Sequence, residues 1–155
     1  GHINLQFEIE GPERNFLSGT GFIQLQGQNI KLKQILLETD LGPLQLPDIQ
    51  WAEAQIIARL SEEQVTLEKL LLGRDTDPFF LQMRGDMEFR FIRNRFRLGQ
   101  YDLQLSANTD RDFKLSLMDL LLLSIKTPTP KGWQYLGRIT GNGTKPPDIE
   151  KISDF

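Results

Sequence analysis

The sequence predicts an all-β protein built on a strongly twisted antiparallel sheet, in the form of a half-barrel, a flattened barrel or a sandwich, with one short helix near the C-terminus. Apolar and polar residues alternate over most of the 155 residues, and this period of two is typical of strands with one buried face. The longest alternating run is Phe79–Phe91, in which the odd positions are apolar apart from Gly85. Turns that contain glycine and proline separate the runs and favour hairpins between neighbouring strands.

Composition narrows the class of protein further. Hydrophobic residues make up 39% of the chain and charged residues 25%, which is typical of a folded globular domain. The formal net charge of -3 gives no electrostatic basis for binding nucleic acid. The chain contains no cysteine, so disulfides and thiol chemistry are excluded. We predict a single β-rich domain over residues 1–144 and a flexible tail over 145–155, where prolines and charged residues are frequent.

In the first half of the chain, each alternating run predicts one strand of a meander. The runs cover 3–10, 19–37, 44–51, 52–60 and 65–72. The second run breaks near Asn29 and the third contains Pro47, so both are expected to be irregular. A polar loop at 61–64 separates the last two runs and predicts a hairpin. A helix over 52–72 is the alternative, because alanine, glutamate, glutamine and leucine are good helix formers.

The second half of the chain predicts one long hairpin, a helix and a closing strand. The strand 79–91 is followed by a return strand whose apolar positions change parity at Gly99, as expected for a β-bulge. A polar pair at 108–109 is suited to cap a helix. The apolar side of this helix, over Phe113–Ser124, is expected to close one end of the sheet. Alternation returns over 133–140 and predicts the last strand.

The apolar face of the long hairpin is the first candidate for a binding surface. It comprises Leu81, Met83, Met87, Phe89, Phe91, Phe96 and Leu98. We interpret these side chains as ordinary core, because the apolar face of an antiparallel sheet normally packs inside the protein. The alternative is a groove for acyl chains, since methionine adapts well to irregular apolar ligands.

Positive charge at the tip of the same hairpin is the second candidate. It comes from Arg90, Arg93, Arg95 and Arg97. We interpret these arginines as a soluble hairpin end that discourages strand pairing between molecules. Contact with anionic lipid headgroups or with an acidic partner is the alternative.

The sequence offers little for catalysis or metal binding. The single histidine is His2, at the start of the chain, which nearly excludes a histidine-based site. Asp75 with Asp77, and Asp110 with Asp112, present the oxygen ligands that suit a hard cation. The spacing implies no third ligand, so we interpret the first pair as a solvated loop and the second as the first turn of the helix. We therefore predict a protein that is not an enzyme and has no cofactor.

The order of motifs over about residues 17–147 resembles a known family. GTGFIQLQGQNIKL is followed by LPDIQWAEAQIIARLSEEQVTLEKLLL, then by FFLQMRGDMEFRF, a leucine-rich segment and WQYLGRITGNGTKPP. With its central DPFFLQMRGD, this order is similar to the C-terminal periplasmic part of the type II secretion system protein N family, in its longer bacterial form. It also resembles the related AsmA-like repeats.

The resemblance implies a function but no catalytic residues. It implies an inner-membrane protein with a periplasmic β-rich domain and an N-terminal transmembrane helix, which this sequence lacks. The expected function is that of an accessory structural component of the secretion apparatus, acting through contacts with other secretion-system proteins. The AsmA-like resemblance implies the alternative, a lipid-handling module. A packed interior would favour the structural component, whereas an apolar trough open on one side would favour lipid handling.

Overall fold

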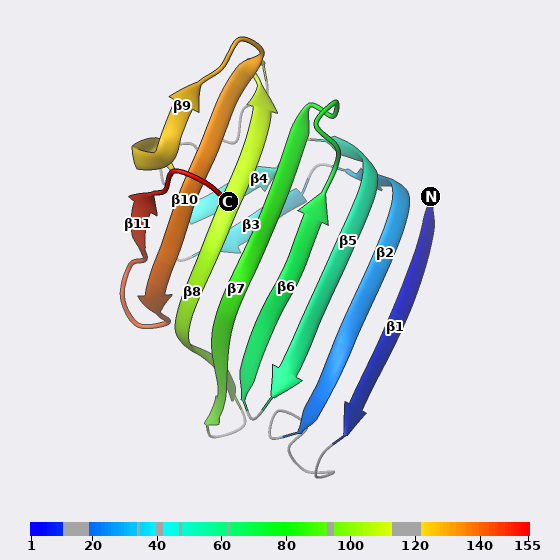
Figure 1. The fold of residues 1–155 in the computed structure, drawn as a ribbon, viewed down its shortest axis with the longest axis vertical. Coiled ribbons are helices and arrows are strands. Elements are labelled where there is room, and N and C mark those ends of the chain that lie inside the picture. The colour runs from blue at the N-terminus through cyan, green and yellow to red at the C-terminus, as the bar shows by residue number, and fades with distance from the viewer. Residues whose placement is uncertain are drawn as a thin grey trace.

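The structure, a computed structural model, describes residues 1–10, 19–33, 35–39, 42–46, 48–61, 63–92, 95–112 and 122–155, without the side chains of 7, 9, 32, 35–39, 42–46, 91, 92, 95 and 96. The strands in these residues form one large antiparallel sheet and a separate two-stranded hairpin (Figure 1). The order in the large sheet is β1 (His2–Glu10), β2 (Thr20–Leu32), β5 (Ile49–Ser61), β6 (Gln64–Leu72), β7 (Phe79–Ile92), β8 (Arg95–Asp110), β10 (Gly132–Asn142) and β11 (Asp148–Lys151). A further strand, β9 (Lys126–Pro128), also pairs with β10. Each strand of the large sheet therefore pairs with the next strand in the chain, except that an interruption separates β2 from β5 and that β8 pairs with β10 instead of β9.

The described part of the chain contributes nine strands to the large sheet. The interruption is a hairpin of β3 (Ile35–Thr39) and β4 (Gly42–Leu46), which pair with each other as a second sheet. In Figure 1 this hairpin is drawn behind the large sheet.

The all-β, antiparallel prediction is confirmed, and the large sheet is open, with β1 at one edge. The helix alternative for 52–72 is wrong, because these residues lie in the paired strands β5 and β6. The predicted strand over 19–37 is divided, since β2 ends at Leu32 and β3 begins at Ile35. The break expected near Asn29 coincides with a positive φ of 53° at that residue.

The β-bulge predicted at Gly99 is confirmed by the register of β7 and β8. Met87 lies opposite Tyr101 and Phe89 lies opposite Leu98, so three steps in β8 match two in β7. The extra residue restores the apolar alternation after the parity change. Phe89 and Leu98 therefore share the face of the sheet on which Met87 lies.

A second irregularity, which the sequence analysis does not predict, lies opposite Gly85. The register of β6 and β7 shifts between Leu67 and Leu70, so β6 also carries an extra residue. Gly85 has a φ of 140°, a conformation that side chains rarely adopt. A Cβ atom there would overlap the main-chain oxygen of Asp102 and lie 2.9 Å from the Cα of Leu103. Glycine is needed because β8 approaches β7 closely at this point.

The predicted start of the C-terminal helix is wrong. Asn108 and Thr109, the expected cap, lie inside β8, where they pair with Gln134 and Trp133 of β10. Strand pairing on both sides of β8 outweighs the local preference of asparagine and threonine for a cap. Residues 113–121 of the predicted helix lie outside the described residues. Its described end, Leu123–Ile125, is a single 3₁₀ turn that leads directly into β9.

The expected tail over 145–155 contains a short strand. Arg138 of β10 lies opposite Glu150 of β11, and Ile139 lies opposite Ile149. The chain then turns across the sheet, where the guanidinium carbon of Arg84 lies 4.8 Å from the centre of the Phe155 ring. Pairing with β10 and this cation–π contact hold the segment against the sheet.

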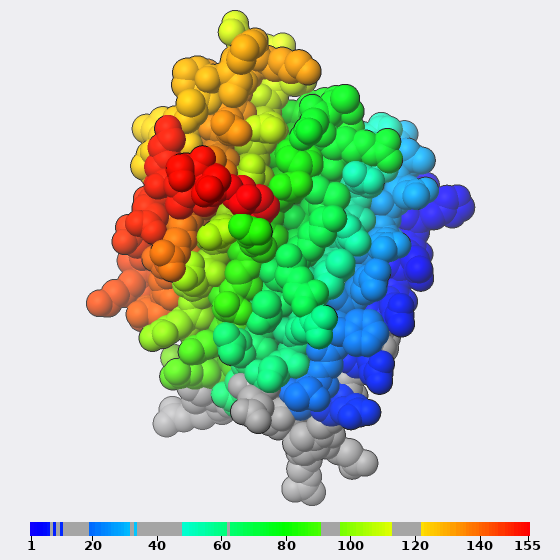
Figure 2. All heavy atoms as spheres, viewed as in Figure 1, coloured from blue at the N-terminus to red at the C-terminus, as the bar shows by residue number. Residues whose placement is uncertain are grey.

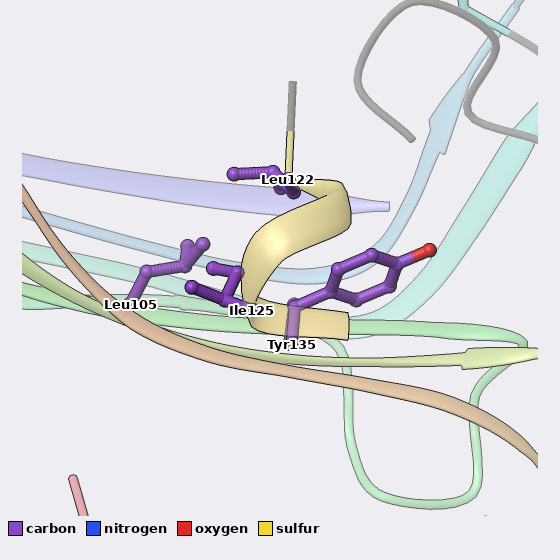
Figure 3. Close-up of a cluster of buried hydrophobic side chains, with 5 residues drawn as sticks. Leu105, Leu122, Ile125 and Tyr135 are labelled. Atoms are coloured by element: carbon purple, nitrogen blue, oxygen red, sulfur yellow. The ribbon is translucent and has the colours of Figure 1, made fainter. Parts of the chain in front are cut away.

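The best-buried cluster of apolar side chains lies where the 3₁₀ turn meets β8 and β10 (Figure 3). It consists of Leu105, Ala107, Leu122, Ile125 and Tyr135. Ile125 is fully buried and Tyr135 is 1% exposed. Ile125 sits over Gly137 so closely that a Cβ on the glycine would lie 2.7 Å from its Cδ1 atom. The turn therefore covers one end of the apolar side of the sheet, as the predicted helix was expected to do.

Candidate functional site

The large sheet has one apolar and one polar face, and the apolar face is the main candidate for a binding surface. The registers of neighbouring strands place the apolar positions beside one another from β1 to β8. We define the open apolar face as Ile3, Leu5, Ile23, Leu25, Ile56, Leu70, Leu81, Met83, Met87, Phe89 and Leu98. Because the side chains of alternate residues point to one side of a strand, these residues form one band across the strands.

Burial changes from one end of this band to the other. Near the 3₁₀ turn, Leu81 and Met83 pack against the buried cluster. At the other end, Ile3 is 68% exposed, Leu5 is 55% exposed and Ile23 is 40% exposed. Large apolar side chains that remain exposed together on one face usually mark a surface for a ligand or another molecule. On the same face, Ala54, Ala58 and Leu67 of β5 and β6 are also buried, so the band is largely covered from its β10 end through its centre and is open at the β1 end.

Five of the seven apolar hairpin residues predicted from the sequence have described side chains, and these five are neither fully buried nor fully exposed. Met87 and Phe89, like Leu81 and Met83, are half-buried, and Leu98 is 39% exposed. Phe91 and Phe96 lie opposite each other in the register, but their side chains are outside the described set. The hairpin therefore combines contact with the core at one end and access to solvent at the other.

The most exposed residues of the face, Ile3, Leu5 and Ile23, lie outside the hairpin that the sequence predicts as a binding surface. The alternation of the first strand was visible, but its position at the edge of the sheet was not. An edge strand has a neighbour on one side alone, so its apolar side chains are less covered than those of a central strand. This exposure depends on strand order, which alternation does not encode.

The structure brings two of the four arginines together. Arg90 and Arg97 lie directly opposite each other on β7 and β8, and both are exposed. The side chain of Arg90 also lies 3.3 Å from Glu88. Arg95 begins β8 but its side chain is not described, and Arg93 lies outside the described residues. The next pair along the strands, Phe89 and Leu98, occupies the apolar face, so positive charge and apolar surface meet at this end of the hairpin.

Polar side chains connect the strands on the opposite face, which Figure 2 shows with the C-terminal segment (red) crossing it. The hydroxyl of Thr66 donates to Asp86 at 2.6 Å, and Arg84 donates to Gln104 at 2.9 Å. Two shallow hollows of about 390 and 340 Å³ lie beside Asp86 and Asp102. Their linings are largely polar and open to solvent, which is typical of a solvated sheet surface.

Asp102 and Arg138 form the best-defined ion pair of this face. The Nε of Arg138 donates to Asp102 at 2.7 Å, and a second nitrogen lies 3.5 Å from Glu150. The hydrogen bond from Arg138, with its positive charge, holds the pKa of Asp102 below its ordinary value. Both side chains of the pair are nearly half exposed, so solvent screening keeps the contribution of the pair to stability small.

We predict that the Arg138→Gln substitution raises the pKa of Asp102 toward its ordinary value. The folded pKa is depressed, so the stabilisation is present above the pKa of the unfolded chain and is lost as pH falls through the folded pKa. NMR titration of the Asp102 carboxyl carbon in both proteins measures the shift directly. Lys151→Gln serves as the control. It removes a positive charge from the neighbouring strand, and this charge does not contact Asp102. Identical Asp102 titrations with and without Arg138 would contradict the assignment.

One member of each candidate carboxylate pair is hydrogen-bonded within the fold. The carboxylate of Asp77 accepts hydrogen bonds from the main-chain N–H of Ala52 at 2.9 Å and of Arg74 at 3.0 Å. Asp110, at the end of β8, donates its N–H to the carbonyl of Pro78. Asp75 and Asp112 are exposed. Within the described ranges, no group of three histidine or acidic side chains has the arrangement needed for a metal ion.

No protein-family model matches this sequence, and no curated protein or solved structure matches it. Among the described residues, the structure has no helix that is both long and apolar enough to cross a membrane. The fold and the two faces of the sheet are therefore the observations on which a functional proposal has to be built.

Proposed function

We propose that this chain is a non-enzymatic binding module whose open apolar face holds the acyl chains of a lipid. One observation carries the proposal, which is the exposure of Ile3, Leu5 and Ile23 beside half-buried apolar residues of the same face. A packed interior would have favoured a purely structural component. An apolar face that is largely covered from β5 to β10 but open at β1 and β2 favours an apolar ligand at its open end.

The chemistry of the face suits an acyl chain. Burial of each methylene group contributes about 0.8 kcal/mol, so a chain lying across several strands gains enough to bind reversibly. Met87 and Phe89 offer adaptable apolar contacts near the hairpin tip. Arg90 and Arg97, on the polar face of the same tip, suit an anionic headgroup at the hairpin end of the strands. The resemblance to AsmA-like repeats points in the same direction.

We predict that delipidated protein binds a fluorescent fatty acid in a saturable manner, and that native mass spectrometry detects lipid on protein purified without delipidation. The double variant Ile3→Asn, Leu5→Asn should bind at least about five-fold more weakly, since it removes apolar area from the open end of the face. These two side chains are more than half exposed, so the fold should persist.

The matched control is Asn4→Ser, Gln6→Ser, which changes the opposite face of the same strand and should bind as the parent protein does. The proposal would be contradicted if the delipidated parent protein showed no saturable binding and no lipid copurified with it. Equal loss of binding in the two double variants would show that the effect comes from the strand and not from its apolar side.

A second candidate function is a structural component of a type II secretion apparatus in the periplasm, acting through contacts with other secretion-system proteins. The observation that favours it is the packed cluster of Leu105, Ala107, Leu122, Ile125 and Tyr135, because a filled interior favours a structural component over a lipid carrier. The lipid experiment separates the candidates, because a structural component requires no saturable binding of acyl chains. Cell fractionation of the full-length protein tests the expected inner-membrane location.

A further inference from the structure

The two edges of the large sheet differ in their protection against pairing with other molecules. At one edge, β9 has three residues and β11 has four, and both pair with β10. Proline ends β9 at Pro128, and Lys151 ends β11. Short strands, prolines and lysines are the usual means by which proteins block an exposed sheet edge.

The other edge, formed by β1, has none of these features. Its nine residues, HINLQFEIE, contain no proline and no lysine. All nine residues pair with β2 in one continuous register without a bulge. The first pair is His2 with Gln28, and the last is Glu10 with Thr20. Among the described strands β1 pairs with β2 alone, so one side of its backbone offers a long, regular row of donors and acceptors.

We propose that β1 pairs antiparallel with β1 of a second copy of this chain, about a two-fold axis that passes through Gln6 perpendicular to the sheet. In this register Leu5 of one copy lies opposite Phe7 of the other, and Ile3 lies opposite Ile9. Asn4 lies opposite Glu8, and His2 lies opposite Glu10. Apolar positions therefore meet apolar positions, polar positions meet polar positions, and no two like charges lie opposite each other.

Three features of β1 select this arrangement. The register centred on Gln6 is the one antiparallel register that pairs all nine residues of both strands. A slip of one residue would place apolar side chains opposite polar ones. A two-fold axis parallel to the strands would put the apolar face of one copy beside the polar face of the other. The perpendicular axis instead joins the two open apolar faces into one continuous surface.

The contact is isologous, since the same strand is used by both copies. Pairing of two nine-residue edges gives an interface at the small end of the specific range, so we expect a reversible dimer that forms in the micromolar to low-millimolar range. The inference does not rest on lipid binding. A chain that dimerises without binding acyl chains would exclude the proposed lipid function alone, and a monomer that binds them would exclude the dimer alone.

Disulfide trapping tests the register, and the absence of cysteine from the chain makes single substitutions unambiguous. Opposed residues in antiparallel strands have Cα atoms about 4.5–5.5 Å apart, within the range for a disulfide. Gln6→Cys should form a covalent dimer readily under mild oxidation. Asn4→Cys and Glu8→Cys should each form little dimer alone, but an equimolar mixture of the two should form the heterodimer.

Sedimentation velocity of cysteine-free variants tests the contact without trapping. Gln6→Glu places like charges opposite each other at the axis and should weaken dimerisation by about three-fold. Mixing it with Gln6→Lys should restore the dimer. Gln24→Lys is the matched control, because Gln24 lies beside Gln6 but one strand further into the sheet, and its dimerisation should equal that of the parent. A monomer across the whole concentration range would overturn the proposal, as would cross-linking of Asn4→Cys alone as fast as Gln6→Cys.

Discussion

Replacement of Ile125 by aspartate should unfold the protein or lower its free energy of unfolding by at least about 4 kcal/mol. Ile125 is fully buried between the 3₁₀ turn and β10, and its side chain fills the space above Gly137. The substitution removes this packing and places a carboxylate where the described neighbours are Leu105, Leu122 and Tyr135. Such a loss approaches the total stability of a small domain, about 5–15 kcal/mol.

Leu123→Asp is the matched control for this prediction, because the same substitution is made two residues earlier in the same turn. Leu123 is 62% exposed, and most substitutions at exposed positions change the free energy of unfolding by less than about 0.5 kcal/mol. Urea denaturation followed by tryptophan fluorescence measures both variants. Similar midpoints for the two would show that the turn does not close the apolar side of the sheet.

The second large effect is expected at Gly85, where alanine should lower the free energy of unfolding by about 3 kcal/mol. Two costs combine at this position. The φ of 140° is strained for any residue with a side chain, and a Cβ would overlap the main-chain oxygen of Asp102. Because the overlap is with main chain, β7 and β8 would have to separate beside the irregular pairing of β6.

Gly27→Ala provides the comparison, since Gly27 also lies in a strand that is paired on both sides, opposite Ile3 of β1 and Ala54 of β5. A Cβ there would meet the end of the Ile30 side chain at 2.7 Å, and a flexible side chain can move. We expect a loss of about 1 kcal/mol or less. Thermal or urea denaturation ranks the two variants, and a Gly85→Ala protein as stable as Gly27→Ala would contradict the need for glycine between β7 and β8.

Over most of the long alternating runs, the sequence by itself determined the type of element and which of its sides is apolar. The run from Phe79 to Phe91 predicted β7, and the parity change at Gly99 located the bulge that faces Glu88. Strand was also the correct choice over helix for 52–72, although the residues there are good helix formers. These features are local, because the alternation within each strand shows which of its side chains face the core.

The tertiary structure alone decided how much of each apolar face is covered. Alternation in β1 and in β8 looks the same, yet Leu5 of β1 is 55% exposed and Leu105 of β8 is 3% exposed. The difference comes from strand order and from the 3₁₀ turn, which packs over β8 and β10 and not over β1. The predicted cap at Asn108 failed for the same reason, because pairing with β7 and β10 extended β8 through it. Burial depends on contacts between segments far apart in the chain, whereas alternation records only which side of a strand is apolar.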